Sequence, residues 1–369
     1  MIKKIREFLA KETVLCVAAV CAIATMFLVP PDIEYLHYID FRVLCLLLCL
    51  MAVVAGLKSI GIFNWLTYQL LRRIHSGSLL GVTLVLLPFL CSMFVTNDVA
   101  LIIFVPFTLM LLDQLGCSNK IVPVTVFQTI AANLGSMATP VGNPQNLYLY
   151  AFYGIGISDF FGVTIPLAII SLIALTVAAM FLLPKKLPGR EIDQVNISSV
   201  KNLVVYSVLF VLCLLAVFRV VPYPVTTAIT VIVLLVVNRK LLKDIDYMLL
   251  LTFVCFFIVS ENLGRIDVVR NFLQRLLQKN AVLTAVGTSQ VISNVPAAVV
   301  LSGFTDQWEA LLAGVNIGGL GTPIASLASL ITMKFYTSWS GAKIGKFLGY
   351  FMAANLIGLV VLLLYVQVC

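Results

Sequence analysis

Residues 92–100 read SMFVTNDVA, and the same pattern returns near the end of the chain at residues 289–297 as SQVISNVPA. Both stretches fit S-x-x-x-[ST]-N-x-x-A and lie inside otherwise apolar sequence. A second pair follows in the same order, because NLGSMATP at residues 133–140 is matched by NIGGLGTP at residues 316–323. Two motifs that recur in the same order indicate an internal duplication. In a membrane chain, duplicated polar segments broken by glycine and proline are the best sequence indication of a transporter's binding site.

The composition is that of a membrane protein. The 369 residues are 61% hydrophobic and 11% charged, whereas a soluble domain carries about 25% charged residues. Apolar runs long enough to cross a bilayer recur along the whole chain. Because helices satisfy their own backbone hydrogen bonds inside lipid, the sequence predicts an all-α polytopic membrane protein. The net charge of +8 suits basic cytoplasmic loops, and no soluble face is large enough to suggest nucleic acid as a partner.

The apolar runs predict the order of the transmembrane elements. Basic residues 1–11 precede a first run that lacks a convincing small-residue cleavage site, so we expect a retained helix rather than a signal peptide. Spans are expected at about residues 14–29, 42–57, 160–183, 202–220, 223–238, 247–260 and 343–367. Amphipathic segments at residues 60–74 and 263–280 are expected at the membrane interface.

The repeated motifs lie in shorter arms and in interrupted segments. Arms at about residues 79–95 and 99–115 meet at the first motif, and a second pair of arms meets at Ser293-Asn294. These arms predict two re-entrant hairpins. Glycine and proline interrupt the segments at about residues 121–150 and 308–333, which predicts two discontinuous helices. Gly135, Gly142, Gly318 and Gly321 are expected to allow the backbone to unwind there.

A polar cytoplasmic linker, residues 185–201, is expected to separate two transmembrane repeats. Residues 1–184 form the first repeat, and residues 202–369 form the second, with one extra helix at residues 202–220. Each repeat has an even number of crossings, so the extra helix inverts the second copy. Basic loops place the N-terminus in the cytoplasm, and the C-terminus is then outside. The basic residues of the 263–280 segment fall on the predicted outer side and argue against this orientation.

The motifs supply the groups that a coupled transporter needs. An unwound segment exposes carbonyls that suit Na⁺, and the helix that follows begins with a positive N-terminus that suits an anion. No lysine or arginine lies within the motifs, so an anion would depend on helix N-termini, hydroxyls, amides and bound cations. The candidate cation ligands are Ser92, Thr96, Asn97, Asn133, Gly135, Ser136, Ser289, Ser293, Asn294, Asn316 and Gly318. The candidate substrate ligands are Thr96, Asn97, Asp98, Thr139, Gly142, Asn143, Ser293, Asn294 and Thr322.

Asp98 is the only acidic residue within a motif. A carboxylate inside the membrane indicates a cation ligand or a proton carrier. The alternative is a structural role as the N-cap of the arm that begins at Val99. Both interpretations stay open at this point.

At these residues the chain resembles the ion transporter superfamily, whose branches include divalent anion:sodium symporters, citrate carriers, arsenite permeases and Na⁺/H⁺ antiporters. The signature stretches are TND at residues 96–98, GSMATPVGNPQN at residues 135–146 and SN at residues 293–294. The resemblance covers nearly the full length in element order. It implies an inverted repeat with two re-entrant hairpins and two unwound helices. It also implies a homodimer that works by elevator-type alternating access, with sodium sites beside the hairpin tips and substrate between them.

The chain departs from the dicarboxylate branch at both tips. Dicarboxylate symporters typically have Ser-Asn-Thr there, and their threonines touch the substrate carboxylates. Here the third positions are Asp98 and Val295, and an ionised Asp98 would repel a dianion. An Asn-Asp tip is more similar to the arsenite-permease branch, which leaves proton coupling open.

The function expected is secondary active transport of a small anion, either a carboxylate or an inorganic oxyanion, coupled to Na⁺ or H⁺ by alternating access. The alternatives are a Na⁺/H⁺ antiporter with Asp98 as the exchanging carboxylate and an arsenite-type efflux permease. No nucleophile elbow or zinc-protease motif is present, so an enzyme is not expected, nor are catalytic residues or an organic cofactor. The expected partners are the anion, membrane lipid and a second copy of the chain. The expected location is the bacterial inner membrane.

Overall fold

The computed structural model describes residues 12–71, 74, 76–184 and 196–368. The basic N-terminal segment and most of the expected linker lie outside these residues. In chain order the helices are α2 (Thr13–Leu28), α3 (Phe41–Ser59), α4 (Ile62–Leu71), α5 (Gly77–Ser92), α6 (Asn97–Gln114), α7 (Ile121–Ser136), α8 (Pro144–Phe152), α9 (Ile157–Ala179), α10 (Val200–Val217), α11 (Tyr223–Asn238), α12 (Tyr247–Gly264), α13 (Asp267–Ile292), α14 (Asn294–Ser302), α15 (Trp308–Ile317), α16 (Leu327–Ser338) and α17 (Ile344–Val368).

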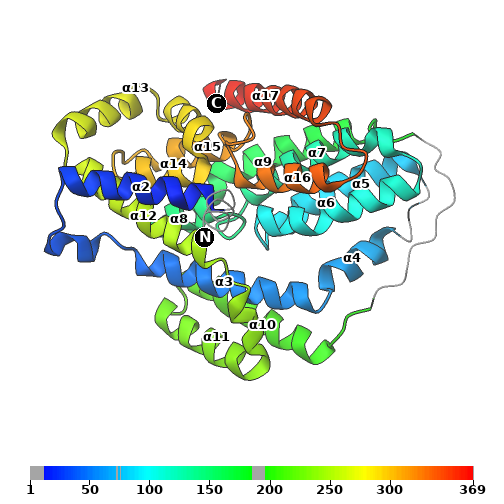
Figure 1. Cartoon of the computed structure of the whole chain (residues 1–369), viewed down its shortest axis with the longest axis horizontal. Coiled ribbons are helices and arrows are strands. Elements are labelled where there is room, and N and C mark those ends of the chain that lie inside the picture. The colour runs from blue at the N-terminus through cyan, green and yellow to red at the C-terminus, as the bar shows by residue number, and fades with distance from the viewer. Residues whose placement is uncertain (1–11, 72–73, 75, 185–195, 369) are drawn as a thin grey trace, which may run out of the picture.

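The protein is an all-α polytopic membrane protein, as the composition predicts. Within the described ranges, seven helices are long and apolar enough to cross a bilayer: α3, α6, α9, α10, α11 with the short turn that follows it, α12 and α17. In Figure 1 most helices run in the same horizontal direction, with α10 and α11 along one edge and α17 along the other.

Buried side chains form two large cores. One core joins α3, α10 and α12 to α8, α14 and α15. The other joins α5, α6, α7, α9, α16 and α17. Of the short helices, α8 and α14 pack within the first core, and α15 contributes to both cores. The repeated motifs lie at the turns before α6 and α14 and at the ends of α7 and α15.

The expected arms are helical hairpins. Helices α5 and α6 pack together and are joined by residues 93–96. Helix α13 bends at Asn280, which has φ −165° and ψ 98°, so its amphipathic first part is separated from the part that packs against α14. The amphipathic segment expected at 263–280 thus ends at this bend.

The two interrupted segments are discontinuous helices. Residues 137–143 separate α7 from α8, and residues 318–326 separate α15 from α16. Helix α8 restarts because Asn143 caps it, accepting the Asn146 N–H at 2.9 Å, and because Pro144 fits the first helical position. The inverted relation of the halves, their exact boundaries and the homodimer stay predictions.

Two details of the sequence interpretation are wrong. Asp98 is not an N-cap, because α6 begins at Asn97 and the cap position belongs to Thr96. Gly135 does not unwind its helix, because it lies inside α7. A Cβ on Gly135 would collide with the Phe89 backbone of α5, so this glycine allows close helix packing instead.

Gly81 provides a test of the close contact between α5 and α9. A Cβ on Gly81 would lie 2.7 Å from the backbone oxygen of Ala179, so Gly81→Ala must push the two helices apart. We expect a loss of about 1–3 kcal/mol, as for other overpacked sites, measured as a lower thermal unfolding midpoint in detergent.

The control is Gly162→Ala on α9, where a Cβ meets nothing within 4 Å. Alanine is the better helix former, so this variant is expected to melt at the same temperature or slightly above. Equal melting of both variants would show that α5 and α9 are not in this contact.

Candidate functional site

The tips of both hairpins adopt the same unusual backbone conformation. Thr96 has φ 65° and ψ 146°, and Ser293 has φ 74° and ψ 156°. This region is almost confined to glycine, and a residue with a side chain costs on the order of 1–3 kcal/mol there. The two residues hold equivalent positions in the repeated motif. The same strain at both tips indicates a shared structural requirement.

Each tip is bonded to the helix break that follows it in the chain. The Asn97 N–H donates to the Gly142 oxygen at 3.2 Å, and the Asn294 N–H donates to the Ala325 oxygen at 3.0 Å. Gly142 and Ala325 hold equivalent positions in the aligned motifs. The N-terminus of α6 therefore lies beside that of α8, and the N-terminus of α14 lies beside that of α16.

The threonines of the second motif hold break and tip together. The Thr139 hydroxyl donates to the Met93 oxygen, and the Thr322 hydroxyl donates to the Gln290 oxygen at 3.4 Å. Met93 and Gln290 both follow the first serine of their tip motif. Thr139 and Thr322 were expected to bind substrate, and the structure places their hydroxyl protons in these structural bonds.

Glycines bring α7 and the end of α15 against the serines of the hairpin arms. A Cβ on Gly135 would lie 2.7 Å from the Ser92 hydroxyl, and a Cβ on Gly318 would lie 2.7 Å from the Ser289 hydroxyl. Both serines are fully buried. Each hydroxyl donates to a carbonyl of its own helix, at 2.9 Å for Ser92 and 2.8 Å for Ser289. Their oxygens keep lone pairs that can accept a cation.

Two hydrogen bonds cross between the halves at equivalent positions. The Asn143 amide, after the first break, donates to the Asn316 oxygen at 3.2 Å. The Ser326 hydroxyl, after the second break, donates to the Asn133 oxygen at 3.0 Å. Asn143 matches Ser326, and Asn133 matches Asn316. These bonds join the tips and breaks of both halves into one buried centre.

The side chains of the two tip asparagines differ in their bonding. The Asn97 amide donates to the Asn133 oxygen at 3.0 Å. The Asn294 oxygen accepts from the Ser293 hydroxyl at 3.4 Å, but its NH₂ group has no hydrogen-bond acceptor among the described residues. Asn294 is only 3% exposed. An amide donor without a protein acceptor, on a residue that is otherwise enclosed, is a candidate ligand contact.

Two residues of the centre were not among the predicted ligands. The Asn146 amide lies 3.1 Å from the oxygens of both Met137 and Thr139. The Gln290 amide donates to the oxygens of Gly318 and Leu320, both at 2.9 Å. Each amide thus occupies carbonyls that a break releases, so fewer carbonyls are left for Na⁺ than expected. Asn146 lies in the motif at residues 135–146, and Gln290 lies in the motif at residues 289–297. An amide side chain close to a predicted helix break was the sequence feature that could have identified them.

Asp98 lies in the first turn of α6 and is partly buried. Its own N–H donates to the Asn97 side-chain oxygen at 3.0 Å. Its carboxylate has neither a hydrogen bond nor an ion pair within the described parts of the chain. The charge lies at the positive end of α6, which favours it, and its oxygens stay available for a cation or a proton.

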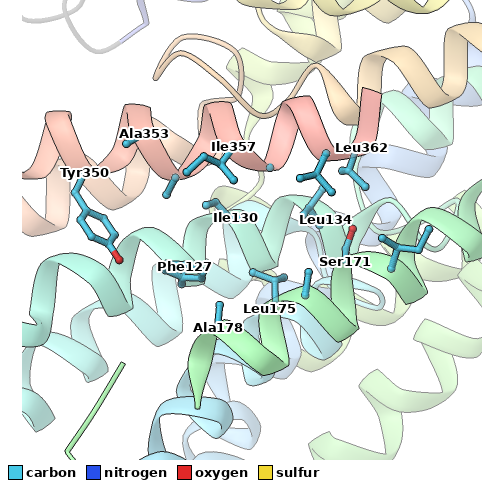
Figure 2. Close-up of a pocket in the computed structure, with 15 residues that line it drawn as sticks. Phe127, Ile130, Leu134, Ser171, Leu175, Ala178, Tyr350, Ala353, Ile357 and Leu362 are labelled. Carbon is cyan, nitrogen blue, oxygen red and sulfur yellow. The ribbon is translucent and has the colours of Figure 1, made fainter. Parts of the chain in front are cut away.

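A cavity elsewhere in the molecule does not suit an anion. A space of about 350 Å³ lies between α7, α9 and α17 and is lined almost entirely by apolar side chains (Figure 2). One of the two hydroxyls in the lining, that of Ser171, donates to the Leu167 oxygen at 2.7 Å. Leu134 faces this cavity while the preceding Asn133 belongs to the polar centre, so α7 separates the two.

Sequence comparison connects this arrangement with a known transporter family. A model of the citrate transporter family matches residues 2–307. The chain belongs to this family. Citrate transporter family members are membrane transporters, and the superfamily resemblance inferred from the tip and break motifs is confirmed.

Relatives in the family are similar over most of the chain. An uncharacterized transporter of Methanocaldococcus jannaschii is 32% identical over 336 residues, which cover 91% of this chain and 92% of the relative. The inner membrane protein YbiR of Escherichia coli is 31% identical over 80% of both chains. The silicon efflux transporter LSI3 of Oryza sativa subsp. japonica is 35% identical over 111 residues, 30% of this chain and 22% of the relative.

Gln290→Met tests whether the glutamine holds the second break together. Methionine has a similar size and stands at the equivalent position, Met93, in the first half. The change removes donors to two carbonyls and the acceptor of the Thr322 N–H, which lies at 2.9 Å. We expect a loss of roughly 2–4 kcal/mol, measured by thermal unfolding in detergent.

The control is Gln278→Met in the exposed part of α13. It makes the same chemical change where the side chain has no bond in the described structure. If both variants unfold at the same temperature, the Gln290 amide does not stabilise the break.

Proposed function

We propose that the protein is a secondary active transporter of a small anion, a carboxylate or an inorganic oxyanion, coupled to Na⁺ or H⁺ by alternating access. The observation that supports this most strongly is the meeting of four helix N-termini, those of α6, α8, α14 and α16, in one buried hydrogen-bonded centre. Each N-terminus carries partial positive charge, and several of its N–H groups are bonded within the tips and breaks. Because the motifs contain no basic side chain, these helix ends are the anion-attracting elements of the centre.

The same centre offers oxygens to a coupling cation. The hydroxyls of Ser92 and Ser289 lie beside Gly135 and Gly318, so each half places a hydroxyl and the end of a helix close together. Na⁺ in broken-helix transporters is held by such carbonyls and hydroxyls. A bound cation would offset the repulsion between an anion and Asp98, which supports coupled transport.

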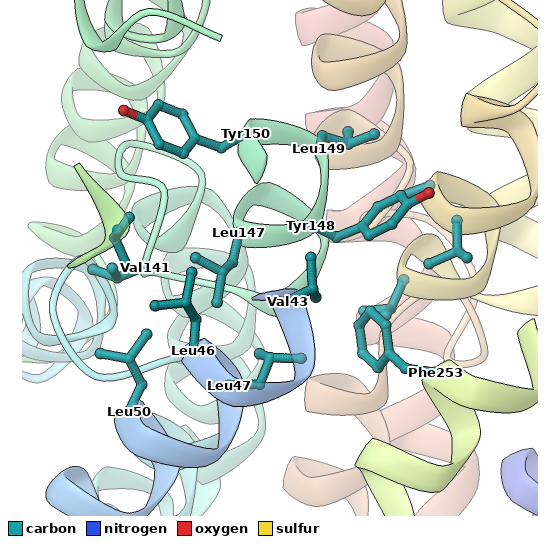
Figure 3. Close-up of a cluster of buried hydrophobic side chains, with 14 of the residues drawn as sticks. Val43, Leu46, Leu47, Leu50, Val141, Leu147, Tyr148, Leu149, Tyr150 and Phe253 are labelled. Carbon is teal, nitrogen blue, oxygen red and sulfur yellow. The ribbon is translucent and has the colours of Figure 1, made fainter. Parts of the chain in front are cut away.

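The architecture supports alternating access between two groups of helices. The matched tip-to-break bonds favour a structural repeat, since both halves repeat the same contacts. The inversion of the second half is part of this proposal. Contacts between α3 and α8 are apolar, with Leu46 and Leu47 of α3 beside Leu147 (Figure 3). Two helices that meet at an apolar interface can move past one another without leaving a buried charge unpaired. A homodimer, an inner-membrane location, a cytoplasmic N-terminus and an outer C-terminus belong to this proposal.

A proton-coupled efflux permease is the second candidate. It is favoured by the Asp98 carboxylate, which has no partner in the described structure, and by the similarity to a relative named as a silicon efflux transporter. A Na⁺/H⁺ antiporter would use the same carboxylate for exchange. In both cases Asp98 carries the proton, whereas in the sodium symporter it helps to hold the cation.

Asn294→Ala tests the central anion site. The purified protein is heated with citrate, sulfate, phosphate or arsenite, each in NaCl and in choline chloride. A ligand at about 100 times its dissociation constant adds roughly 2.7 kcal/mol of stability. We expect one anion to stabilise the wild type only with sodium, and Asn294→Ala to lose this stabilisation.

The control is Asn64→Ala, which changes an exposed asparagine of α4 and should keep the anion effect. An unchanged anion effect in Asn294→Ala would remove Asn294 from the site. Stabilisation by Na⁺ or by pH alone, with no effect of any anion, would favour the antiporter.

Asp98→Asn separates the coupling mechanisms. In the antiporter and the proton-coupled permease, the neutral amide cannot carry a proton and transport should fall to background. In the sodium symporter, the amide oxygen can still accept a cation, so we expect reduced transport with weaker dependence on external pH. The measurement is uptake into proteoliposomes with an imposed Na⁺ or pH gradient.

Asp113→Asn on the same helix is the matched control. Its carboxylate accepts the Ser118 hydroxyl at 2.8 Å near the exposed end of α6, away from the tip. We expect transport close to wild type. Equal, complete loss in both variants would indicate a folding defect of α6, which thermal unfolding of the same samples would reveal.

A further inference from the structure

Arg219 occupies a backbone position that normally belongs to glycine. It follows α10 with φ 63°, and its N–H donates to the Ala216 oxygen while the Val220 N–H donates to the Leu215 oxygen. This is a Schellman helix end, whose left-handed residue is usually glycine. A side chain there costs roughly 1–2 kcal/mol. The arginine side chain must therefore contribute something that glycine cannot.

The Arg219 guanidinium reaches the C-terminal end of α8. One nitrogen donates to the Gly154 oxygen at 2.9 Å and another donates to the Tyr150 oxygen at 3.0 Å. The guanidinium also lies over the Tyr150 ring, 5.3 Å from its centre. Figure 3 shows Tyr150 pointing away from the side of α8 on which Tyr148 lies near Phe253 of α12. Arg219 thus fastens α10 to the negative end of the helix whose positive end lies in the centre.

A second arginine lies beside it without a carboxylate partner. Arg42 lies in the first turn of α3, a helix that packs against both α8 and α10, and its charge interacts with that of Arg219. Asp40 also interacts electrostatically with Arg42, and its carboxylate caps α3 by accepting the Val43 N–H at 3.1 Å. Neither arginine has an ion pair within the described parts of the chain.

We propose that Arg42 and Arg219 form a recruitment site for a small carboxylate or oxyanion, at the seam where α3 and α10 meet α8. The site rests on the proposed anion transport and would receive the anion before it reaches the centre. Arg219 uses two of its five N–H groups on α8, so others remain for a bidentate contact with the anion. An anion between the guanidiniums replaces their mutual repulsion by attraction.

The location suits this role. Arg42 follows the 30–41 loop, Arg219 lies between α10 and α11, and Gly154 lies between α8 and α9, which the basic-loop pattern places together on the outer side.

Arg265 is the matched control on the same side. It donates to Asp32 at 2.7 Å and lies 3.6 Å from Glu34. Its hydrogen bond to Asp32 lowers the pKa of that carboxyl. Because Arg265 already has acidic partners, an added anion should not bind it.

The test is protection of arginines from phenylglyoxal, a reagent that modifies guanidinium groups, followed by peptide mass spectrometry. Labelling is measured in phospholipid-free detergent with no addition, with sulfate and with citrate. We expect at least one of these anions to slow labelling of Arg42 and Arg219 about fivefold and to leave Arg265 unchanged. Asn294→Ala should keep this protection, because the recruitment site is separate from the centre.

Transport kinetics provide the second readout. Arg42→Gln should raise KM for the protecting anion several-fold with kcat within about twofold, whereas Arg265→Gln should change neither. The opposite result would be transport of either anion with no protection of Arg42 and Arg219 and with a wild-type KM in Arg42→Gln. This result would contradict the recruitment site and leave the proposed transport function intact. Protection without transport would support the site and contradict the proposed function.

A lipid phosphate offers the same chemistry as a free oxyanion. The labelling is therefore repeated in vesicles of phosphatidylglycerol and of phosphatidylcholine without added anion. Labelling in both kinds of vesicle as fast as in detergent supports a site for the free anion. Protection in phosphatidylglycerol vesicles, with none from sulfate or citrate in detergent, would assign the arginine pair to a lipid headgroup and overturn recruitment.

Discussion

The requirement that no backbone polar group stay unpaired at membrane depth governs this structure. A helix that breaks inside a bilayer releases carbonyls and N–H groups whose isolation costs several kcal/mol each. Here side-chain amides pair with the released carbonyls. Asn146 donates to carbonyls of the break between α7 and α8, and Gln290 donates to carbonyls of the break between α15 and α16. These amides allow the chain to keep irregular backbone, and therefore free helix ends, in the middle of the protein.

The two halves meet this requirement with different residues at equivalent places. Asn146 belongs to the helix after its break, whereas Gln290 reaches its break from a neighbouring hairpin arm. The backbone contacts between tip and break are nevertheless the same in both halves. The duplicated feature is thus the path of the backbone, and the side chains that stabilise it have diverged.

Much of the fold could be predicted because the length of an apolar run indicates a membrane helix, and because glycine and proline within a run indicate a helix break. The contacts between halves could not: Asn143 and Asn316 are separated by 173 residues, and Ser326 and Asn133 by 193. No local pattern encodes such a pair. Gly135 was misread because glycine serves both unwinding and close packing, and only the position of the Phe89 backbone distinguishes these roles.

The difference between the tips follows from small substitutions around them. In the first half, Ser136 accepts the Asn143 amide at 3.1 Å, and Asn97 is bonded to Asn133. In the second half Gly319 replaces this serine, and a Cβ there would lie 2.8 Å from the Asn294 amide nitrogen. The glycine leaves room beside an amide that has no acceptor in the described structure. The first tip is therefore more fully hydrogen-bonded than the second, whose Asn294 amide donor is available to the proposed transport site.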